Sequence, residues 1–526
     1  AHDCALVSCL APIRPPESGP ARMNTSNHTE RKSPRPYSIS KPESGEKSAY
    51  PHILEKSSLH KSPDDALFLC PYKNLMSKTA KAAENLPDSL TAGLTRLIRQ
   101  KPVGPRDLDM AALFVLDAVA NILGGRNSEP GRTLLAWWNE ALSGNSGADA
   151  GRWAFLMGAL CHILETDDLH RTSVVHPGCV VVPAAWALAA RPGAEVDGPA
   201  FLTAVLHGFE AATRVGMAVG AAHYKIWHNT ATCGPFGSAM AGAHLLGLSE
   251  AETVHALGNA GSQSSGLWQF LETGAMTKHL HAGHAAEAGL RAAELAKVGF
   301  TGPPKILEGE KGFFRAACPD AKPEAVLADA GAPWQLTLTS IKPWPSCRHT
   351  HPAIDAAGGL RARLKAAGTT AEDVVKVEAD VYQAAIDVCD RPSPDTDYDA
   401  KFSLQHAVAV ALLRDKVDFE AFGPEERDHA RALAARVELR AAQPYDGAYP
   451  ISWGSAVRVH LKSGEVLEET RKSAKGDPEA PLARDEMIEK AAMLMRHGGI
   501  AAPDRLIEDI LALAQPGSAL PVLDIV

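Results

Sequence analysis

Acidic, basic and histidine side chains gather in four short segments of the sequence. The first segment, ETDDLHRTSVVHPG over residues 165–178, carries Asp167, Asp168 and His176. It closes an apolar run that we expect to be helical, and carboxylates at a helix C-terminus need either solvent or a positive partner. Two interpretations stay open: a solvated loop, or a site in which a carboxylate orients a histidine for proton transfer.

The second segment places His228 directly after Trp227 and shortly before a stretch of small residues that favours a helix. At a helix N-terminus the macrodipole lowers the pKa of a histidine and favours bound anions. His228 is therefore either a structural histidine or a general base.

The third segment is TKHLHAGH, residues 277–284. Lys278 lies ahead of a predicted helix, where its ammonium group is placed to hold a substrate carboxylate. His279, His281 and His284 are spaced i, i+2 and i+5, which fits neither one face of a helix nor a known zinc spacing. We therefore expect no bound metal.

The fourth segment, KPWPSCRHTHP, covers residues 342–352 and is stiffened by prolines. It begins with Lys342, and its Cys347 and Arg348 directly precede a predicted helix. A cysteine at a helix N-terminus beside basic residues has a lowered pKa and more thiolate character. The alternative is that Cys347 is a small buried apolar residue.

All four segments carry lysine or histidine and enter a helix of small residues, so they predict a shared polar cavity between two domains. Walker, GxSxG, HExxH, EF-hand and dinucleotide-binding glycine motifs are absent from the sequence. The chemistry is therefore expected to need no cofactor.

Two regions with different hydrophobic patterns contain the elements that position these segments. Apolar residues recur at helical spacing up to about residue 336, whereas strand-like alternation appears after it. The predicted helices of the first region are 109–123, 132–142, 152–165, 198–216, 237–246, 250–258 and 285–297. The predicted elements of the second region are strands 335–341, 374–381 and 457–462 and helices 352–366 and 406–413; helices 486–496 and 504–514 follow.

These patterns predict a mainly α fold with an α+β insertion. Residues 86–336 and 466–526 would form one large helical domain, and residues 337–465 a smaller α+β domain. Residues 1–85 are expected to be a disordered leader, because residues 1–75 hold ten of the 37 prolines and no sustained apolar period. A second interpretation is that this leader has no function. We expect no signal peptide there.

The composition limits the classes of partner. The 526 residues carry 53 Lys and Arg against 62 Asp and Glu, so the net charge of −9 argues against a nucleic-acid binder. Nine scattered cysteines without a CxxC pair predict reduced thiols and a cytoplasmic location. No apolar run reaches the roughly 18–20 residues of a membrane helix. A small-molecule substrate is the expected partner.

Longer stretches around the four segments resemble the MmgE/PrpD family, which includes 2-methylcitrate dehydratase, cis-aconitate decarboxylase and iminodisuccinate epimerase. The stretches are DDLHRTSVVHPG, WHNTATCGPFGSA, MTKHLHAGHAA and KPWPSCRHTHPAIDA. The resemblance covers roughly residues 86–514. It implies an all-helical domain with an inserted α+β lid, a homodimer, and cofactor-independent chemistry on small polycarboxylates.

The resemblance also implies roles for single residues. The catalytic loop acid of the family matches Asp168 best, and the family's two motif histidines match His176 and His228. The substrate-binding lysines correspond to Lys278, which has His281 beside it, and to Lys342.

Cys347 departs from the family pattern. Dehydratase-like and decarboxylase-like members have a histidine five residues after the lysine that matches Lys342, whereas the wording WPSC is similar to epimerase-like members. We add Arg348 to the groups expected to hold substrate carboxylates and Cys347 to those expected to transfer protons.

The shared chemistry of this family is a carbanion or enolate next to a carboxylate, which cationic side chains stabilise. We expect a lyase of the dehydratase type, with His228 or His176 as the base and Asp168 orienting one of them. An epimerase, in which Cys347 acts on the opposite face of the substrate, and a decarboxylase are the alternative enzymes. A non-catalytic binding protein is the alternative outside enzymes.

Overall fold

The computed structural model describes residues 87–142 and 149–526, all of which belong to one compact unit. The leader predicted over residues 1–85 lies outside the described residues. The described part is mainly helical and contains one four-stranded sheet, which confirms the predicted fold class.

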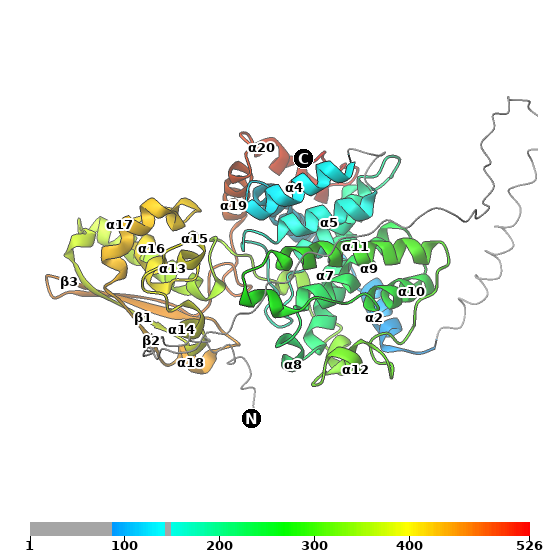
Figure 1. Cartoon of the computed structure of the whole chain (residues 1–526), viewed down its shortest axis with the longest axis horizontal. Coiled ribbons are helices and arrows are strands. Elements are labelled where there is room, and N and C mark those ends of the chain that lie inside the picture. Colours follow the sequence, from blue (N-terminus) through cyan, green and yellow to red (C-terminus); the bar gives the residue numbers. More distant parts are fainter. Residues whose placement is uncertain (1–86, 143–148) are drawn as a thin grey trace, which may run out of the picture. The chain divides into compact units, whose positions relative to one another are not determined.

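Two separate hydrophobic cores divide the helices and strands. The first core contains residues from 94 to 341 and again from 487 to 525, whereas the second lies within residues 353–461. The helices around the first core are α2 (Leu90–Gln100), α3 (Pro105–Gly125), α4 (Glu129–Leu142), α5 (Ala150–Cys161), α6 (Gly178–Ala189), α7 (Gly198–Ala218), α8 (Ala221–Tyr224), α9 (Asn229–Leu245), α10 (Glu250–Gly261), α11 (Thr277–Lys297), α12 (Phe313–Ala317), α19 (Arg484–His497) and α20 (Asp504–Leu511). We call this part the helical domain (Figure 1).

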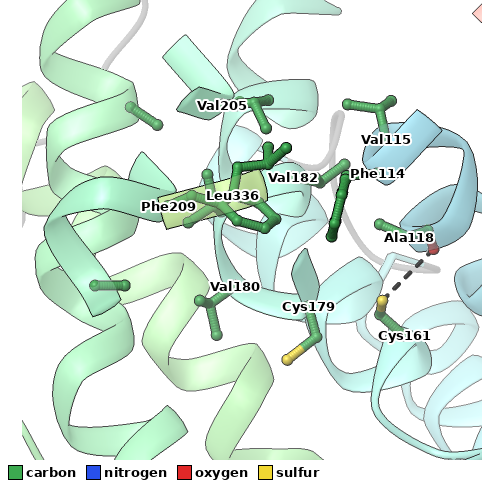
Figure 2. Packing of buried hydrophobic residues seen from close by; sticks show 14 of the residues in the cluster. Phe114, Val115, Ala118, Cys161, Cys179, Val180, Val182, Val205, Phe209 and Leu336 are labelled. Atoms are coloured by element: carbon green, nitrogen blue, oxygen red, sulfur yellow. Dashed lines mark hydrogen bonds between the residues drawn. The ribbon is translucent and has the colours of Figure 1, made fainter. Parts of the chain in front are cut away.

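The core of the helical domain is built from aromatic and branched side chains that meet between α3, α6 and α7 (Figure 2). Phe114 of α3 and Phe209 of α7 pack edge to face with ring centroids 5.8 Å apart. Burying a side chain of this size contributes roughly 1.5–3 kcal/mol. Small residues bring helices into contact nearby: a Cβ on Gly208 would lie 2.4 Å from Val181 Cγ1 and 2.9 Å from the carbonyl oxygen of Gly237.

Helix α3 is the one helix of the described residues that is long and apolar enough to cross a membrane. In this structure 78% of its most apolar window is buried inside the protein, as in the core helix of a globular domain. Pro105 at its first turn and Asp107, whose carboxylate accepts from the backbone N–H of Gly104 at 2.8 Å, define where it begins.

The remaining elements form the α+β domain. Its strands are β1 (Val374–Val381), β2 (Val437–Ala441), β3 (Ser455–Leu461) and β4 (Val466–Arg471), in the order β2-β1-β3-β4. β1 is parallel to β2 and antiparallel to β3, and β3 is antiparallel to β4. The helices are α13 (His351–Ala366), α14 (Gln383–Cys389), α15 (Asp397–Lys401), α16 (Leu404–Leu413), α17 (Pro424–Ala434) and α18 (Tyr445–Ala448). α13 and α16 share the second core with the inward faces of β1 and β3.

The last strand extends the sheet past residue 465, where the sequence pattern placed the end of the α+β domain. β4 alternates exposed and half-buried residues and buries none of them completely. A strand without a buried face has no strong apolar alternation, which is the signal that sequence analysis depends on.

The strand predicted over 335–341 was wrong. Residues Gln335–Leu338 form a short 3₁₀ helix, although Leu and Thr alternate there. The hydroxyl groups of Thr337 and Thr339 donate to the carbonyl oxygens of Trp334 and Gln335, at 2.8 and 2.9 Å. Because these side chains satisfy nearby backbone carbonyls, they stabilise a tight turn in place of an extended strand.

Candidate active site

The first predicted segment is a loop between two helices of the helical domain. α5 ends at Cys161, so Glu165 lies in the loop that follows and is not the last residue of the helix, as the predicted helix 152–165 would require. Glu165 has a positive φ of 63°, which is uncommon for a residue other than glycine and often marks a functional position. The backbone turn at this residue directs successive side chains of the loop to different partners.

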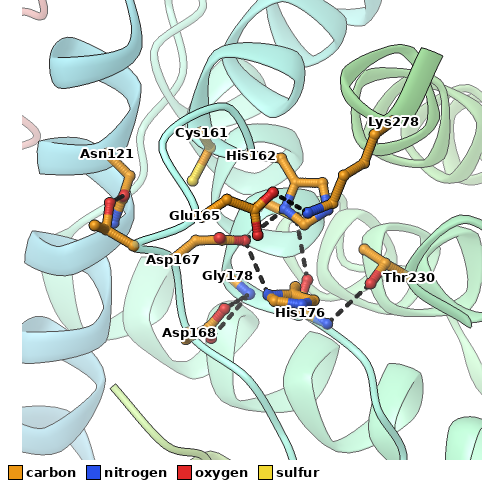
Figure 3. A network of polar contacts seen from close by, with 12 residues as sticks. Asn121, Cys161, His162, Glu165, Asp167, Asp168, His176, Gly178, Thr230 and Lys278 are labelled. Carbon is orange, nitrogen blue, oxygen red and sulfur yellow. Dashed lines mark hydrogen bonds and ion pairs between the residues drawn. The ribbon is translucent and has the colours of Figure 1, made fainter. Parts of the chain in front are cut away.

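Asp167 is the carboxylate that contacts histidines (Figure 3). Its Oδ2 lies 2.6 Å from Nδ1 of His162 and 3.1 Å from Nδ1 of His176, and its side chain is 2% exposed. Burial opposes ionisation, but the two histidines outweigh it and hold the pKa of Asp167 well below its usual range. Burial also lowers the pKa of His162 to about 3. At neutral pH the group therefore contains an ionised Asp167 carboxylate beside a neutral His162 imidazole.

Asp168, the residue that the sequence favoured as the catalytic acid, has a different partner. Both of its carboxylate oxygens lie 3.0 Å from the backbone nitrogen of Gly178, the first residue of α6. The carboxyl group thus caps a helix N-terminus. Burial, followed by the negative charges of Asp167 and Asp117, raises its pKa well above the usual value. The structure shows no contact between Asp168 and either described histidine of this group.

His228 directly precedes α9, which begins at Asn229, eight residues before the predicted start at 237. Its Nδ1 lies 3.3 Å from Nδ1 of His281, and its ring stacks on His162 with an interplanar angle of 13°. Burial, together with the nearby His162 and Lys278, lowers the pKa of His228 well below the usual value. Burial also lowers the pKa of His281 to about 4. His228 and His281 therefore carry no charge at neutral pH.

Lys278 and Lys342 converge on one carboxylate, that of Glu165. Lys278 lies in the first turn of α11, which begins at Thr277 and not at the predicted residue 285, and forms an ion pair with Glu165 Oε1. Lys342 Nζ lies 3.8 Å from Oε2 and donates to the Glu165 carbonyl oxygen at 3.0 Å. Burial opposes ionisation of Glu165, but the two lysines bring its pKa below the usual value. Because the Glu165 side chain is 26% exposed, this is the accessible part of the site.

A two-residue bridge brings Lys342 to this position. The N–H and C=O groups of Leu169 pair with those of Ser340, each at 2.9 Å. The next residue, Ile341, donates its N–H to the carbonyl oxygen of Gly476 at 2.8 Å. The chain that leads into the α+β domain is therefore joined to the loop that carries Glu165.

Cys347 directly precedes the short 3₁₀ helix Arg348–Thr350 that leads into α13. A hydrogen bond from the Cys389 thiol, which outweighs burial, lowers the pKa of Cys347, and the His349 backbone N–H and Lys342 act in the same direction. The predicted thiolate character of Cys347 thus agrees with its surroundings.

Arg348 is nearly fully buried and forms an ion pair with Asp477. Asp477 also accepts a hydrogen bond from the hydroxyl of Ser340 at 2.5 Å. The guanidinium group is therefore engaged with protein partners, and none of its described contacts is with Glu165, Lys278 or Lys342.

Three tyrosines whose pKa values respond to groups of the site were missed by sequence analysis. They come from α8 and from the α+β domain, and they are Tyr224, Tyr398 and Tyr449. Burial raises the pKa of each, to about 12 for Tyr449, so all three stay protonated at neutral pH. The charges of Glu165 and Lys278 act on the pKa values of both Tyr224 and Tyr398. No motif marks them, because each is an isolated tyrosine in its own segment.

His162 was missed as well, because it falls inside the predicted helix 152–165. The available signal was its spacing, since it lies five residues before Asp167 at the end of an apolar run.

His162, Asp167 and His176 offer ligand atoms that lie within 4.8 Å of one another, close enough to surround a metal ion. Ligands at about 2.05 Å around a tetrahedral ion lie roughly 3.3 Å apart. The His162–Asp167 separation of 2.6 Å is shorter and is that of a charge-assisted hydrogen bond. The geometry therefore fits a proton-transfer group better than a set of metal ligands.

Comparison with family models accounts for most of the chain. A model of the MmgE/PrpD N-terminal domain matches residues 100–326, and one of the MmgE/PrpD C-terminal domain matches residues 344–513. The chain belongs to the MmgE/PrpD family. This confirms the predicted resemblance, and the two matches fall on the helical domain and on a segment from the α+β domain into the C-terminal helices.

Individual members of the MmgE/PrpD family are similar at low identity. Cis-aconitate decarboxylase of Aspergillus terreus is 26% identical over 396 residues, which are 71% of this chain and 80% of the relative. Human cis-aconitate decarboxylase is 28% identical over 346 residues, 64% of this chain and 71% of the relative. Mitochondrial 2-methylcitrate dehydratase of Yarrowia lipolytica is 25% identical over 234 residues, 43% of this chain and 45% of the relative. Decarboxylases and dehydratases are both lyases, which supports this reaction class at the level of the family.

Proposed function

We propose that this member of the MmgE/PrpD family is a cofactor-independent lyase that forms a carbanion next to a carboxylate of a small di- or tricarboxylate. The observation that carries the proposal is the convergence of Lys278 and Lys342 on one carboxylate beside an Asp–His group. Two ammonium groups are the cationic environment that a developing carbanion next to a carboxylate requires.

In this proposal the lysines hold the substrate. Lys342 donates one hydrogen bond to a backbone carbonyl, and its contact with Glu165 at 3.8 Å is long. Since an ammonium group has three donors, Lys342 keeps capacity for a substrate carboxylate. Glu165 would orient both ammonium groups and share them with the substrate.

His176 is the base that the geometry favours over His228. Its Nδ1 faces the ionised Asp167, which stabilises the imidazolium that forms when Nε2 takes a proton. His228 faces another histidine and lies next to Lys278, so protonation at this position is opposed. His228 and His281 would then fix the position of the neighbouring rings and exclude water.

Dehydration and decarboxylation are the two reactions that this site would support. In dehydration, His176 removes the proton from the carbon next to the carboxylate, the C–O bond breaks, and the hydroxyl group leaves as water after protonation by a site acid. In decarboxylation, the C–C bond breaks, CO₂ leaves, and the electron pair on carbon receives a proton from the site. The sequence led us to expect dehydration of a 2-methylcitrate-like substrate. The longer matches to cis-aconitate decarboxylases make decarboxylation of a cis-aconitate-like substrate the second candidate.

The position of Cys347 favours a further candidate, epimerisation. This reaction needs proton donors and acceptors on two faces of one carbon, and a thiol of lowered pKa within electrostatic range of Lys342 and Glu165 provides a second group. Each product remains an isomer of the substrate, so neither water nor CO₂ is released.

Proton NMR in deuterated buffer distinguishes the three reactions with the purified full-length protein. We expect an alkene proton in place of one methylene group from citrate, collapse of the methyl doublet to a singlet from 2-methylcitrate, or itaconate-like methylene signals from cis-aconitate. Deuterium incorporation with inversion and no loss of atoms would indicate an epimerase. If no polycarboxylate of such a panel is converted or exchanged, the proposed lyase function is wrong.

A further inference from the structure

Thr166, the residue between the site carboxylates Glu165 and Asp167, is fixed by hydrogen bonds of both its side chain and its backbone. Glu165 faces Lys278 and Asp167 faces His162, so Thr166 is the point from which two neighbouring side chains diverge. Thr166 is fully buried, and its hydroxyl hydrogen-bonds to Oδ1 of Asn121 on α3. Its carbonyl oxygen accepts a hydrogen bond of 2.7 Å from Lys490 Nζ on α19.

Lys490 reaches Thr166 as one half of a buried ion pair. Lys490 and Asp117 of α3 are in direct contact, and each side chain is 3% exposed. Asn121, one turn after Asp117, donates to the Asp117 carbonyl oxygen at 2.9 Å, and so belongs to the same network. Lys490 thus joins α19 to α3 and to the loop. Its two partners, Asp117 and Thr166, lie 373 and 324 residues away in the sequence.

Stability alone gives no reason for a charged pair at this place. Removing two charges from water costs several kcal/mol per ion, and well-packed apolar residues of similar volume are often as stable or more stable. An apolar pair lacks the N–H donor that Lys490 directs to the Thr166 carbonyl. The hydrogen bond from Lys490 to the Thr166 carbonyl is the feature that distinguishes this network from a general packing contact.

We propose that Lys490 and Asp117 are a positioning pair that fixes the backbone at Thr166, so that Glu165 is presented to the lysines and Asp167 to the histidines. Asp117 holds the ammonium group in place, and the ammonium group holds the carbonyl. Neither residue touches the reacting atoms, so both act through the loop. The catalytic part of this proposal rests on the proposed lyase function, whereas its structural part does not.

The test is the double variant Lys490→Met/Asp117→Leu of the full-length protein, which removes both charges and leaves none unpaired. We expect it to fold with a melting temperature near that of the wild type. A displacement of about 1 Å in a catalytic group costs up to about 100-fold. We therefore expect kcat to fall at least tenfold, with KM within threefold of the wild type. Amide hydrogen exchange in residues 162–170 should become at least tenfold faster.

Lys101→Met is the matched control. Lys101 also forms a buried ion pair, with Glu210 at 2.8 Å, and also donates to a backbone carbonyl, that of Pro333, at 3.1 Å. Neither partner belongs to the site, so this variant should lose stability while kcat and exchange in residues 162–170 stay unchanged. Should the double variant not fold, Lys490→Gln/Asp117→Asn, which also removes both charges, is compared with Lys101→Met by the same two readouts.

The outcomes separate this proposal from the proposed lyase function. A folded double variant with wild-type kcat and wild-type exchange in residues 162–170 would overturn the positioning pair. If the wild type converts no polycarboxylate, the lyase function is wrong, and the exchange measurement alone then decides on the positioning pair. If amide exchange in residues 162–170 is faster in the Lys490 and Asp117 variants and not in Lys101→Met, the positioning pair is supported whether or not the lyase function holds.

Discussion

Replacing Asp167 with asparagine isolates the charge of the carboxylate from its shape. Only Oδ2 contacts the two histidines, while Oδ1 has no hydrogen-bond partner. An asparagine can place its oxygen at the Oδ2 position and its NH₂ group at the Oδ1 position. The contacts of His162 and His176 are then retained, and the variant Asp167→Asn removes the negative charge alone.

The size of the effect follows from the contact with His176. A hydrogen bond to a charged group, such as that between His162 and Asp167, is worth about 1.5–3 kcal/mol and a neutral one about 0.5–1.5 kcal/mol, so loss of the charge costs about 1–1.5 kcal/mol for each such bond. A Coulomb estimate for unit charges at the 3.1 Å separation, with an effective dielectric constant of about 20, gives an upper value of about 5 kcal/mol. Since each 1.36 kcal/mol is tenfold in rate, kcat should fall between about tenfold and several thousandfold.

The assay is steady-state turnover of whichever polycarboxylate the wild type converts, with kcat and KM measured from pH 5.5 to 8.5. KM should change little, because Asp167 does not contact the lysines that hold the substrate. The neighbouring variant Asp168→Asn is the control: its carboxyl group caps α6 and has a raised pKa, so we expect kcat within threefold of the wild type. A loss below threefold in Asp167→Asn, or a larger loss in Asp168→Asn, would refute the assignment of Asp167.

Three further predictions concern other groups of the site. Lys278→Met should lower kcat/KM at least tenfold and raise KM, because an ion-paired ammonium group is lost; unchanged KM in the same turnover assay would contradict the binding role. Cys347→Ser should leave a lyase reaction within about threefold but abolish epimerisation, as followed by deuterium incorporation; full epimerase activity in this variant would exclude the two-face mechanism. Acidification from pH 7 to 5 should lower the urea midpoint: an unfolded histidine takes up a proton near pH 6.5, whereas burial lowers the pKa of His281 to about 4 and that of His162 to about 3. Each contributes up to about 2 kcal/mol over this range. The raised pKa values of Asp117 and Asp168 have the opposite effect, because these carboxyl groups take up protons in the folded protein and stabilise it on acidification. The buried histidines outnumber them; a urea midpoint that rises on acidification would show that the two aspartates dominate.

Sequence analysis predicted where the reactive side chains lie more reliably than where the helices begin. α9 and α11 start eight residues before their predicted starts. The prediction began these helices too late because glycines, and Pro235 in α9, lie near their N-terminal ends. These residues are poor helix formers by themselves, and packing of the surrounding helices overrides that preference. Lys278 and His281 consequently lie one turn apart in the first part of α11 and not in a loop ahead of it.

The choice between Asp167 and Asp168 could not be made from the sequence. Adjacent residues of a loop point in different directions, and the direction depends on the backbone at Glu165 and on the bonds made by Thr166. Those bonds come from Asn121 and Lys490, which are 45 and 324 residues away. A local pattern contains no information about such distant partners: the family motif favoured Asp168, whereas Asp167 is the carboxylate that contacts the histidines.

The hydrogen bond between Ile341 and Gly476 has a consequence for how the chain is assembled. The chain leaves the helical domain and returns to it at neighbouring positions, 2.8 Å apart between backbone nitrogen and oxygen. Everything between them, including the whole sheet, is an inserted module whose two ends meet. Because both ends of the inserted segment lie at one place, its length and content can differ without rerouting α19. Lys342 lies just inside this junction, so a change of the inserted segment changes one of the two lysines that contact Glu165 together with Cys347, while Lys278 and His176 belong to the helical domain.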